Sequence, residues 1–225
     1  MIFWKVLWKI LDLILLIHAE HGGGNNSTFT SHVVSSTGTD TYSSVSASIG
    51  SLKGPLHGGA NCMVSNMIED IKKNCSYTNE EFLKEYIRKI FMGEAFDRSG
   101  KVYGMGHAIY TLSDPRAVIL KKKAYELAKE KGQLEEFELF SNVEKFTKEI
   151  GKEIKGESFE ICANVDLYSG FVYKLLNIPT NIFTPLFALA RIASWNAHRI
   201  EQITSDKKII RPAYKAIDVH GKLLI

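Results

Sequence analysis

Helical periodicity is the feature that most restricts how this chain can fold. Apolar residues recur every three or four positions along most of its length, and no run alternates apolar and polar residues as a half-buried strand would. Met63, Met67 and Ile71, for example, share one face of a helix predicted from Gly59 to Lys73. Hydrophobic residues make up 45% of the chain, which is enough to fill a core between such helices. We therefore expect an all-α fold.

Turn and capping residues divide the pattern into further helices. Thr78-Asn79-Glu80-Glu81 resembles a capping box before a helix that ends at Phe91. Asp114 is expected to cap a helix with Pro115 in its first turn, and Thr184-Pro185 is expected to start the last long helix. The glycine-containing segment 100–111 is predicted to be a loop, with a short hairpin as the alternative. The other helices are predicted at residues 1–18, 28–37, 42–52, 134–154 and 165–176.

The first 17 residues are strongly apolar but lack the pattern of a membrane-spanning segment. Lys5, Lys9 and Asp12 interrupt them along one helical face, and the uncharged run that follows is far shorter than the about 20 residues that span a bilayer. No small-residue cleavage site follows, as it would after a signal peptide. Because no capping signal precedes this helix, we interpret the chain as one that lacks its beginning. A helix lying on a membrane surface is the alternative.

Charge and cysteine content exclude several classes of protein. A formal net charge of +3 is too small to indicate a nucleic-acid-binding protein, although it permits a modest anion site. The three cysteines are an odd number without the spacing of metal ligands. They fit a reducing compartment, so we expect a cytoplasmic protein.

Four segments combine histidine or aspartate with glycine or turn residues, and these are the candidates for chemistry. In one of them, Gly58 and Gly59 leave the backbone beside His57 free of side chains that would crowd a ligand. In another, His18 and His21 are three positions apart and could bind zinc with a third ligand, but no cysteine or carboxylate set completes such a site. We therefore expect no bound metal. The segments are 18–25, 52–61, 103–108 and 163–170.

Taken together, these segments resemble one known family. HAEHGGGNNSTFTSHVVSSTGTDTYSS, GSLKGPLHGGAN, YGMGHAIYTLSDPR and NVDLYSGFVY occur in the order and at the separations found in citrate synthase. The resemblance runs from about His18 to Pro212. It implies an all-α homodimer in which each subunit has a large and a small domain. On this basis residues 57–177 form a complete small domain, while 1–56 and 178–225 are parts of a large domain whose first portion is missing.

The resemblance also implies three catalytic roles. His57 corresponds to the histidine that donates a hydrogen bond to the thioester carbonyl of acetyl-CoA. Asp166 corresponds to the base that removes a proton from the methyl group. His107 corresponds to the histidine that polarises the ketone of oxaloacetate. A carboxylate can deprotonate a thioester only if the charge forming on the enol oxygen is stabilised, which explains why all three are needed.

Substrate-binding roles follow from the same resemblance. The residues that resemble ligands of the oxaloacetate carboxylates are His21, Arg116 and Arg191, and Arg211 resembles an arginine lent to the neighbouring subunit. The residues that resemble the loop at the CoA adenine are Val102, Tyr103, Gly104, Met105 and Gly106. His32, His198 and His220 match none of these roles, so we interpret them as structural or surface residues.

The implied activity is that of an acyltransferase, which condenses acetyl-CoA with oxaloacetate to citrate and CoA at the start of the tricarboxylic acid cycle. CoA would then be substrate and product, with no permanently bound cofactor. Two alternatives stay open. One is a shortened, catalytically impaired chain that only binds a ligand or a full-length homologue. The other is a 2-methylcitrate synthase that uses propionyl-CoA, because one methylene group changes binding by only about 1–3 kcal/mol.

Overall fold

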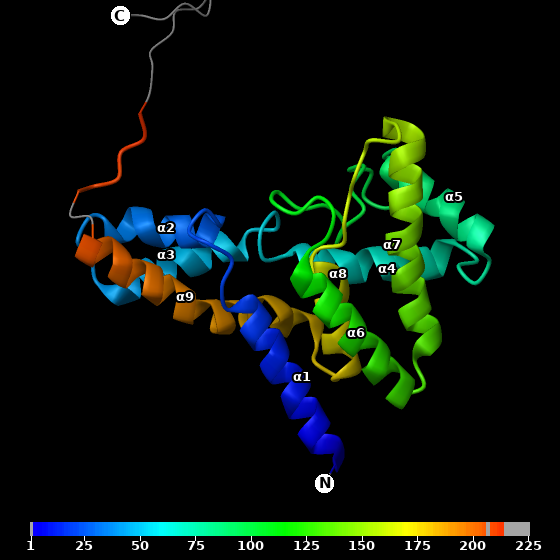
Figure 1. Ribbon diagram of the computed structural model, residues 1–225, viewed down its shortest axis with the longest axis horizontal. Helices are drawn as coiled ribbons and strands as arrows, with labels where there is room; N and C mark the ends of the chain where they lie inside the picture. The colour runs from blue at the N-terminus through cyan, green and yellow to red at the C-terminus, as the bar shows by residue number, and fades with distance from the viewer. Residues whose placement is uncertain (1, 206–207, 214–225) are drawn as a thin grey trace, which may run out of the picture. The chain divides into compact units, whose positions relative to one another are not determined.

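The fold is all-α throughout the part of the chain that the structure describes. The computed structural model describes residues 2–205 and 208–213, except for the side chains of residues 2–7. Within these ranges no strand forms, and Met105 and Ala163 make only an isolated bridge. The elements are α1 (Ile2–His18), α2 (Asn26–Ser35), α3 (Thr41–Lys53), α4 (Ala60–Asn74), α5 (Glu80–Phe91), α6 (Pro115–Glu130), α7 (Leu134–Lys155), α8 (Val165–Leu175), the 3-10 turn η1 (Thr180–Ile182) and α9 (Phe183–Ser205) (Figure 1).

The structure confirms one predicted helix start and corrects another. Asp114 caps α6, with its carboxylate accepting a hydrogen bond from the backbone N–H of Arg116 at 3.0 Å. In α5 the cap is Asn79 rather than Thr78. The Asn79 side chain accepts from the backbone N–H groups of Glu81 and Phe82 at 2.9 and 3.2 Å. Asparagine caps a helix at least as well as threonine. Asn79, directly before the first residue of α5, is therefore the cap, and Thr78 lies one position outside the helix.

The predicted start of α9 is also wrong. The helix begins at Phe183, directly after η1, so Thr184 lies within its first turn. The Thr184 hydroxyl donates to the backbone carbonyl of Gly58 at 2.8 Å. Because the Thr184 hydroxyl donates to Gly58, far along the chain, it does not cap α9.

Two compact units make up the chain, and each is described separately. Unit 1 contains residues 1–20 and 52–191, and unit 2 contains residues 21–51 and 192–225. The division into small-domain and large-domain segments that the family resemblance implies stays a prediction. No described helix is long and apolar enough to cross a membrane.

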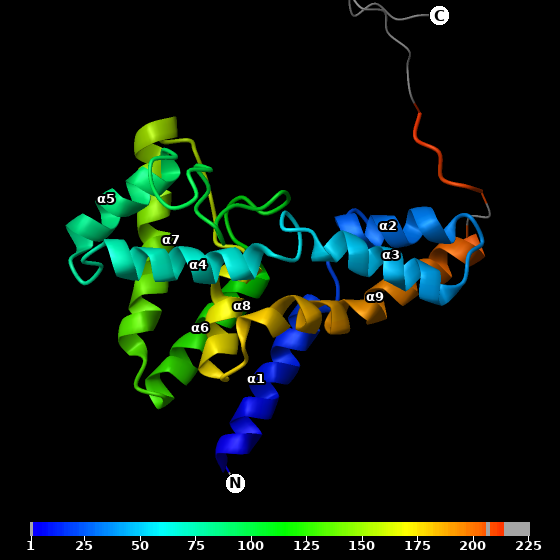
Figure 2. The same cartoon turned by 180° about the vertical axis from the view of Figure 1, so that it is seen from behind.

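In unit 1 the packing is centred on α8. This helix contacts α4, α6 and α7, and also η1 (Figure 2). Tyr168, Val172 and Tyr173 are fully buried, and the Phe171 ring lies 4.7 Å from the ring of Phe140 on α7. The middle of α8 is therefore fixed by its neighbours, and this fixes the position of its N-terminal turn.

Unit 2 is built from α2, α3 and most of α9, which lie side by side in both views (Figures 1 and 2). Buried serines line the contact between α2 and α3. The Ser44 hydroxyl lies 3.2 Å from that of Ser31 and 2.9 Å from that of Ser35. On α9 the buried Trp195 indole donates to the Ser27 hydroxyl at 3.2 Å. Small side chains with satisfied hydroxyls let these helices approach closely.

Candidate active site

The N-terminal turn of α8 carries Asp166 in a largely desolvated position. Its backbone N–H donates to the side chain of Asn164, the cap of the helix, at 3.0 Å. Burial raises the pKa of Asp166 to about 6, with Arg116 and Arg191 opposing that rise and Asp114 adding to it. A carboxylate with a pKa near the working pH suits general base catalysis, because it is both ionised and more basic than a solvated aspartate.

The glycine loop before α6 is held against the same helix turn. Asn164 donates from its side chain to the Gly106 carbonyl at 2.8 Å and from its backbone to the Gly104 carbonyl at 2.9 Å. Gly106 in turn donates its N–H to the carbonyl of Cys162 at 2.8 Å. These bonds fix the loop that carries His107 relative to the turn that carries Asp166.

A substitution at this link should affect both stability and activity. We expect Asn164→Ala to lower the free energy of unfolding by about 2–3 kcal/mol, since it removes a helix cap and a partly buried hydrogen bond to the loop. Asn79→Ala, at the exposed cap of α5, should cost only about 1 kcal/mol. Denaturant unfolding measures both losses. Only Asn164→Ala should also lower kcat/KM for the reaction that the family resemblance implies, and equal kinetics in the two variants would contradict the role of this link.

His107 has a defined tautomer. Its Nδ1 atom accepts hydrogen bonds from the backbone N–H groups of Ile109 and Tyr110 at 3.0 and 3.1 Å. Burial, and then the charge of Arg116, lower the pKa of His107, so the ring is neutral near pH 7. Since Nδ1 is the acceptor, the proton of the neutral ring sits on Nε2. His107 is thus a hydrogen-bond donor from Nε2.

Arg116 is fixed beside this donor. Its guanidinium donates to both carboxylate oxygens of Asp114, at 3.0 and 2.8 Å. Its Nη2 atom lies 3.3 Å from Nε2 of His107. A guanidinium can only donate, so with the proton on Nε2 this is a contact between two donors, and the two bonds to Nδ1 favour that tautomer over one bond to Nε2. Asp114 is fully buried; burial would raise its pKa, but the hydrogen bonds from Arg116 hold the pKa below the usual value. Two N–H-bearing groups this close together can bind one anion.

His57 and Arg191 form the second part of the site. Burial, and then the charge of Arg191, lower the pKa of His57, which keeps this ring neutral as well. Arg191 on α9 is fully buried and donates from Nε to the His18 carbonyl at 2.7 Å. Its guanidinium also lies 4.8 Å from the centre of the Phe187 ring. Burial lowers the pKa of Arg191 to about 10, so it stays cationic near pH 7.

Electrostatic interactions connect Asp166 with both arginines. They also connect Arg191 with His57 and Arg116 with His107. His21 and Arg211, the other expected substrate ligands, belong to unit 2, where His21 is partly buried and Arg211 is exposed. The expected catalytic and oxaloacetate-binding residues that share unit 1 are His57, His107, Arg116, Asp166 and Arg191, and the expected CoA loop at 102–106 belongs to the same unit.

His18 is a residue whose place beside the site the sequence did not indicate. It is completely buried at the end of α1, and its ring lies 4.4 Å from the ring of Phe187. Burial, then the charges of Arg191 and Arg116, lower the pKa of His18 to about 3. A neutral imidazole therefore interacts electrostatically with both arginines. In the sequence His18 stood out only as the first residue of the 18–25 segment and, with His21, as an incomplete zinc pair.

A pocket of about 540 Å³ in unit 1 adjoins the glycine loop. All five loop residues from Val102 to Gly106 line it, together with apolar side chains such as Met63 and Phe91. The Lys155 ammonium lies 5.2 Å from the centre of the Phe91 ring and 4.7 Å from that of Phe159. This combination of apolar walls and a cationic edge suits a flat ring system that carries phosphate.

Comparison with known proteins identifies one family. Residues 3–213 match the family described as "Citrate synthase, C-terminal domain". A citrate synthase of Synechocystis sp. is 42% identical over 214 residues, which cover 95% of this chain and 49% of that protein. A 2-methylcitrate synthase of Shewanella oneidensis is 36% identical, covering 96% of this chain and 52% of the relative. The chain thus spans about half the length of these relatives.

Solved structures point in the same direction. A citrate synthase of the archaeon Thermoplasma acidophilum, solved as a ternary complex with carboxymethyl coenzyme A and oxaloacetate, is 29% identical to this chain. The two superpose with a TM-score of 0.75, and the match covers 96% of this chain and 55% of that one. The all-α arrangement described above is the fold of that enzyme over the matched part.

Proposed function

Since this chain belongs to the citrate synthase family, we propose that it condenses acetyl-CoA with oxaloacetate to give citrate and CoA. The observation that carries the proposal is the surroundings of Asp166. A carboxylate whose pKa is raised to about 6 stands in electrostatic contact with two arginines, and each arginine interacts with a neutral histidine. Such a set combines a base, hydrogen-bond donors and cationic groups for carboxylates.

In the first step Asp166 takes a proton from the methyl carbon of acetyl-CoA. The electron pair of the broken C–H bond moves onto the thioester oxygen as an enol or enolate forms. His57, neutral because burial lowers its pKa, donates a hydrogen bond to that oxygen. The proton transfer is feasible because the charge is stabilised where it develops.

In the second step the nucleophilic carbon attacks the ketone of oxaloacetate. His107 donates from Nε2 to the ketone oxygen, since its Nδ1 atom is occupied by two backbone N–H groups. Arg116 and Arg191 bind the substrate carboxylates, and the buried Asp114 holds Arg116 in orientation. Water then hydrolyses the resulting citryl thioester to citrate and CoA.

The glycine-loop pocket supplies the CoA site in this proposal. The adenine ring would lie against the backbone of residues 102–106 and the apolar side chains around them, with Lys155 near the phosphates. We propose in addition that His21 contributes to oxaloacetate binding, and that Arg211 completes the site of a second subunit in a cytoplasmic homodimer. Oxaloacetate and acetyl-CoA are the proposed substrates, with no permanently bound cofactor.

Turnover by the purified chain tests the proposal directly. The free thiol of CoA, released from acetyl-CoA plus oxaloacetate, is followed with a chromogenic disulfide reagent. Release that requires both substrates supports the enzyme. Oxaloacetate binding by calorimetry without thiol release would instead favour the alternative of a binding module. The same assay with propionyl-CoA tests the second alternative, which the Shewanella oneidensis relative at 36% identity keeps open.

The rate should depend on pH through Asp166. The base acts only when ionised, so kcat/KM for acetyl-CoA should fall about tenfold per pH unit below pH 6 and level off above it. Burial lowers the pKa values of His57 and His107, so both rings are neutral at pH 7 and above, where the plateau is expected. Initial rates between about pH 5 and pH 8 test this expectation. A constant kcat/KM over that range would contradict Asp166 as the base.

A further inference from the structure

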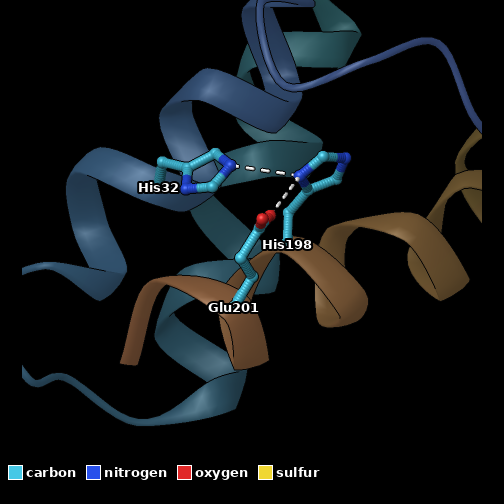
Figure 3. Close-up of side chains that lie close together, drawn as sticks. All are labelled: His32, His198 and Glu201. Carbon is cyan, nitrogen blue, oxygen red and sulfur yellow. Dashed lines mark hydrogen bonds and ion pairs between the residues drawn. The ribbon is translucent and has the colours of Figure 1, made fainter. Parts of the chain in front are cut away.

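Unit 2 contains a group of side chains that plays no part in the proposed reaction. His32 on α2 meets His198 and Glu201 on α9 (Figure 3). The Nε2 atom of His32 lies 3.1 Å from Nδ1 of His198, and that Nδ1 lies 3.5 Å from a carboxylate oxygen of Glu201. The three ligand atoms all fall within 4.8 Å of one another. The sequence had suggested only structural or surface roles for both histidines.

The hydrogen bonding of His32 directs a lone pair into this group. Its other nitrogen, Nδ1, lies 2.9 Å from Oε1 of Gln202. An amide oxygen can only accept a hydrogen bond, so Nδ1 of His32 carries the proton. In the neutral ring Nε2 then presents its lone pair toward His198. Histidines that bind metals are typically oriented in this way, by donating from the second nitrogen to an oxygen.

Space beside the two nitrogens is left open by Gly23. A Cβ atom at this position would lie 3.4 Å from Nε2 of His32 and 3.7 Å from Nδ1 of His198. The backbone of Gly23 has no positive φ angle, so conformation does not require glycine there. Any larger side chain would narrow the space next to the ligand atoms.

We propose that His32 Nε2, His198 Nδ1 and the Glu201 carboxylate bind a zinc-type divalent cation. In a tetrahedral zinc site with bonds of about 2.0–2.1 Å, neighbouring ligand atoms lie about 3.3 Å apart. The two measured separations, 3.1 and 3.5 Å, bracket that value. Two imidazoles and one carboxylate favour zinc over magnesium or calcium, which prefer all-oxygen sites. Binding displaces the Nδ1 proton of His198 into solvent, and the ion links α2 to α9.

Calorimetric titration of the chelator-treated full chain with zinc chloride tests the site. We expect one equivalent to bind with a dissociation constant in the micromolar range or below. His32→Ala and His198→Ala should weaken binding about a hundredfold or more, and Glu201→Gln about tenfold. Glu201 is 66% exposed, so its variant should keep the fold, which circular dichroism verifies.

Two matched controls separate this site from zinc on surface side chains. Glu138→Gln changes an exposed glutamate of α7, and His220→Ala removes an imidazole outside the described residues. Both variants should bind zinc as the parent does. Excess zinc should also raise the melting temperature of the parent by about 5 °C but not that of Glu201→Gln. Absence of a bound equivalent, or equal affinity in the parent, His198→Ala and Glu201→Gln, would overturn the proposal.

Discussion

Asp166→Asn is expected to abolish most turnover and at the same time to make the protein more stable. The amide has the shape of the carboxylate but cannot accept the methyl proton, so kcat should fall by about a hundredfold to ten-thousandfold, the usual contribution of a general base. Oxaloacetate binding should persist, because the groups proposed to bind its carboxylates, Arg116 and Arg191, are unchanged.

The stability gain follows from the direction of the pKa shift. Folding raises the pKa of Asp166 from 3.8 to about 6, so the folded protein disfavours the charged form. The loss of folding free energy that this shift causes is absent below the pKa of unfolded Asp166. It grows between the unfolded and folded pKa values and is complete above pH 6. The full loss of folding free energy is of the order of 3 kcal/mol. Asparagine carries no charge and avoids that cost, so the variant should melt several degrees higher at about pH 8.

Melting curves at about pH 8 and about pH 4, together with oxaloacetate calorimetry, test this prediction. The stability difference should disappear at the lower pH, where Asp166 is protonated in the parent. Asp12→Asn, at an exposed aspartate of α1, is the control and should leave turnover unchanged. Equal loss of oxaloacetate binding and turnover, or a lower melting temperature at pH 8, would contradict a desolvated base at this position.

Local sequence rules predicted the helices well but failed where tertiary contacts compete. Asp114 was identified as a cap because capping depends on neighbouring backbone N–H groups. Thr184 was not placed correctly, because its hydroxyl bonds the Gly58 carbonyl, a partner 126 residues away that no local rule can supply. The choice between Thr78 and Asn79 failed for a different reason, since either neighbour can cap a helix.

The candidate site likewise contains residues that the sequence indicated and contacts that it did not. Motif resemblance indicated Asp166 and its partners, but it did not reveal that Asn164 joins the glycine loop to the turn carrying the base. The buried position of His18 beside the arginines also depends on α9, far along the chain. His32 and His198 are 166 residues apart, so their pairing could not be read from spacing. Interactions between distant segments account for each of these omissions.

Gly104→Ala is expected to be the most destabilising single change in the candidate site. Gly104 has a φ angle of +83°, in the left-handed region that costs other residues about 1–2 kcal/mol. An added Cβ would also stand 2.8 Å from both Cα and Cβ of Leu167, closer than real atoms approach. Overpacking of this kind typically costs roughly a further 1–3 kcal/mol, giving a total of about 2–5 kcal/mol.

Gly106→Ala is the matched control for this prediction. Its φ angle is +87°, but the added Cβ would meet only the Ile161 side chain, at 3.7 Å, which is ordinary contact. Gly106→Ala should therefore lose only about 1–2 kcal/mol, because it bears the backbone cost alone. Denaturant unfolding of the two variants separates the conformational cost from the steric one. Equal losses would mean that the approach of Gly104 to α8 does not matter for stability.

The steric part of the cost has a functional consequence. Leu167 directly follows Asp166, so relief of the clash at Gly104 must move either the glycine loop or the first turn of α8. Each movement changes the position of the proposed base relative to His107. Gly104→Ala should therefore lower kcat/KM more than Gly106→Ala, even at a temperature where both variants are fully folded. If the two retain equal activity under those conditions, close packing of the loop on α8 is not what positions Asp166.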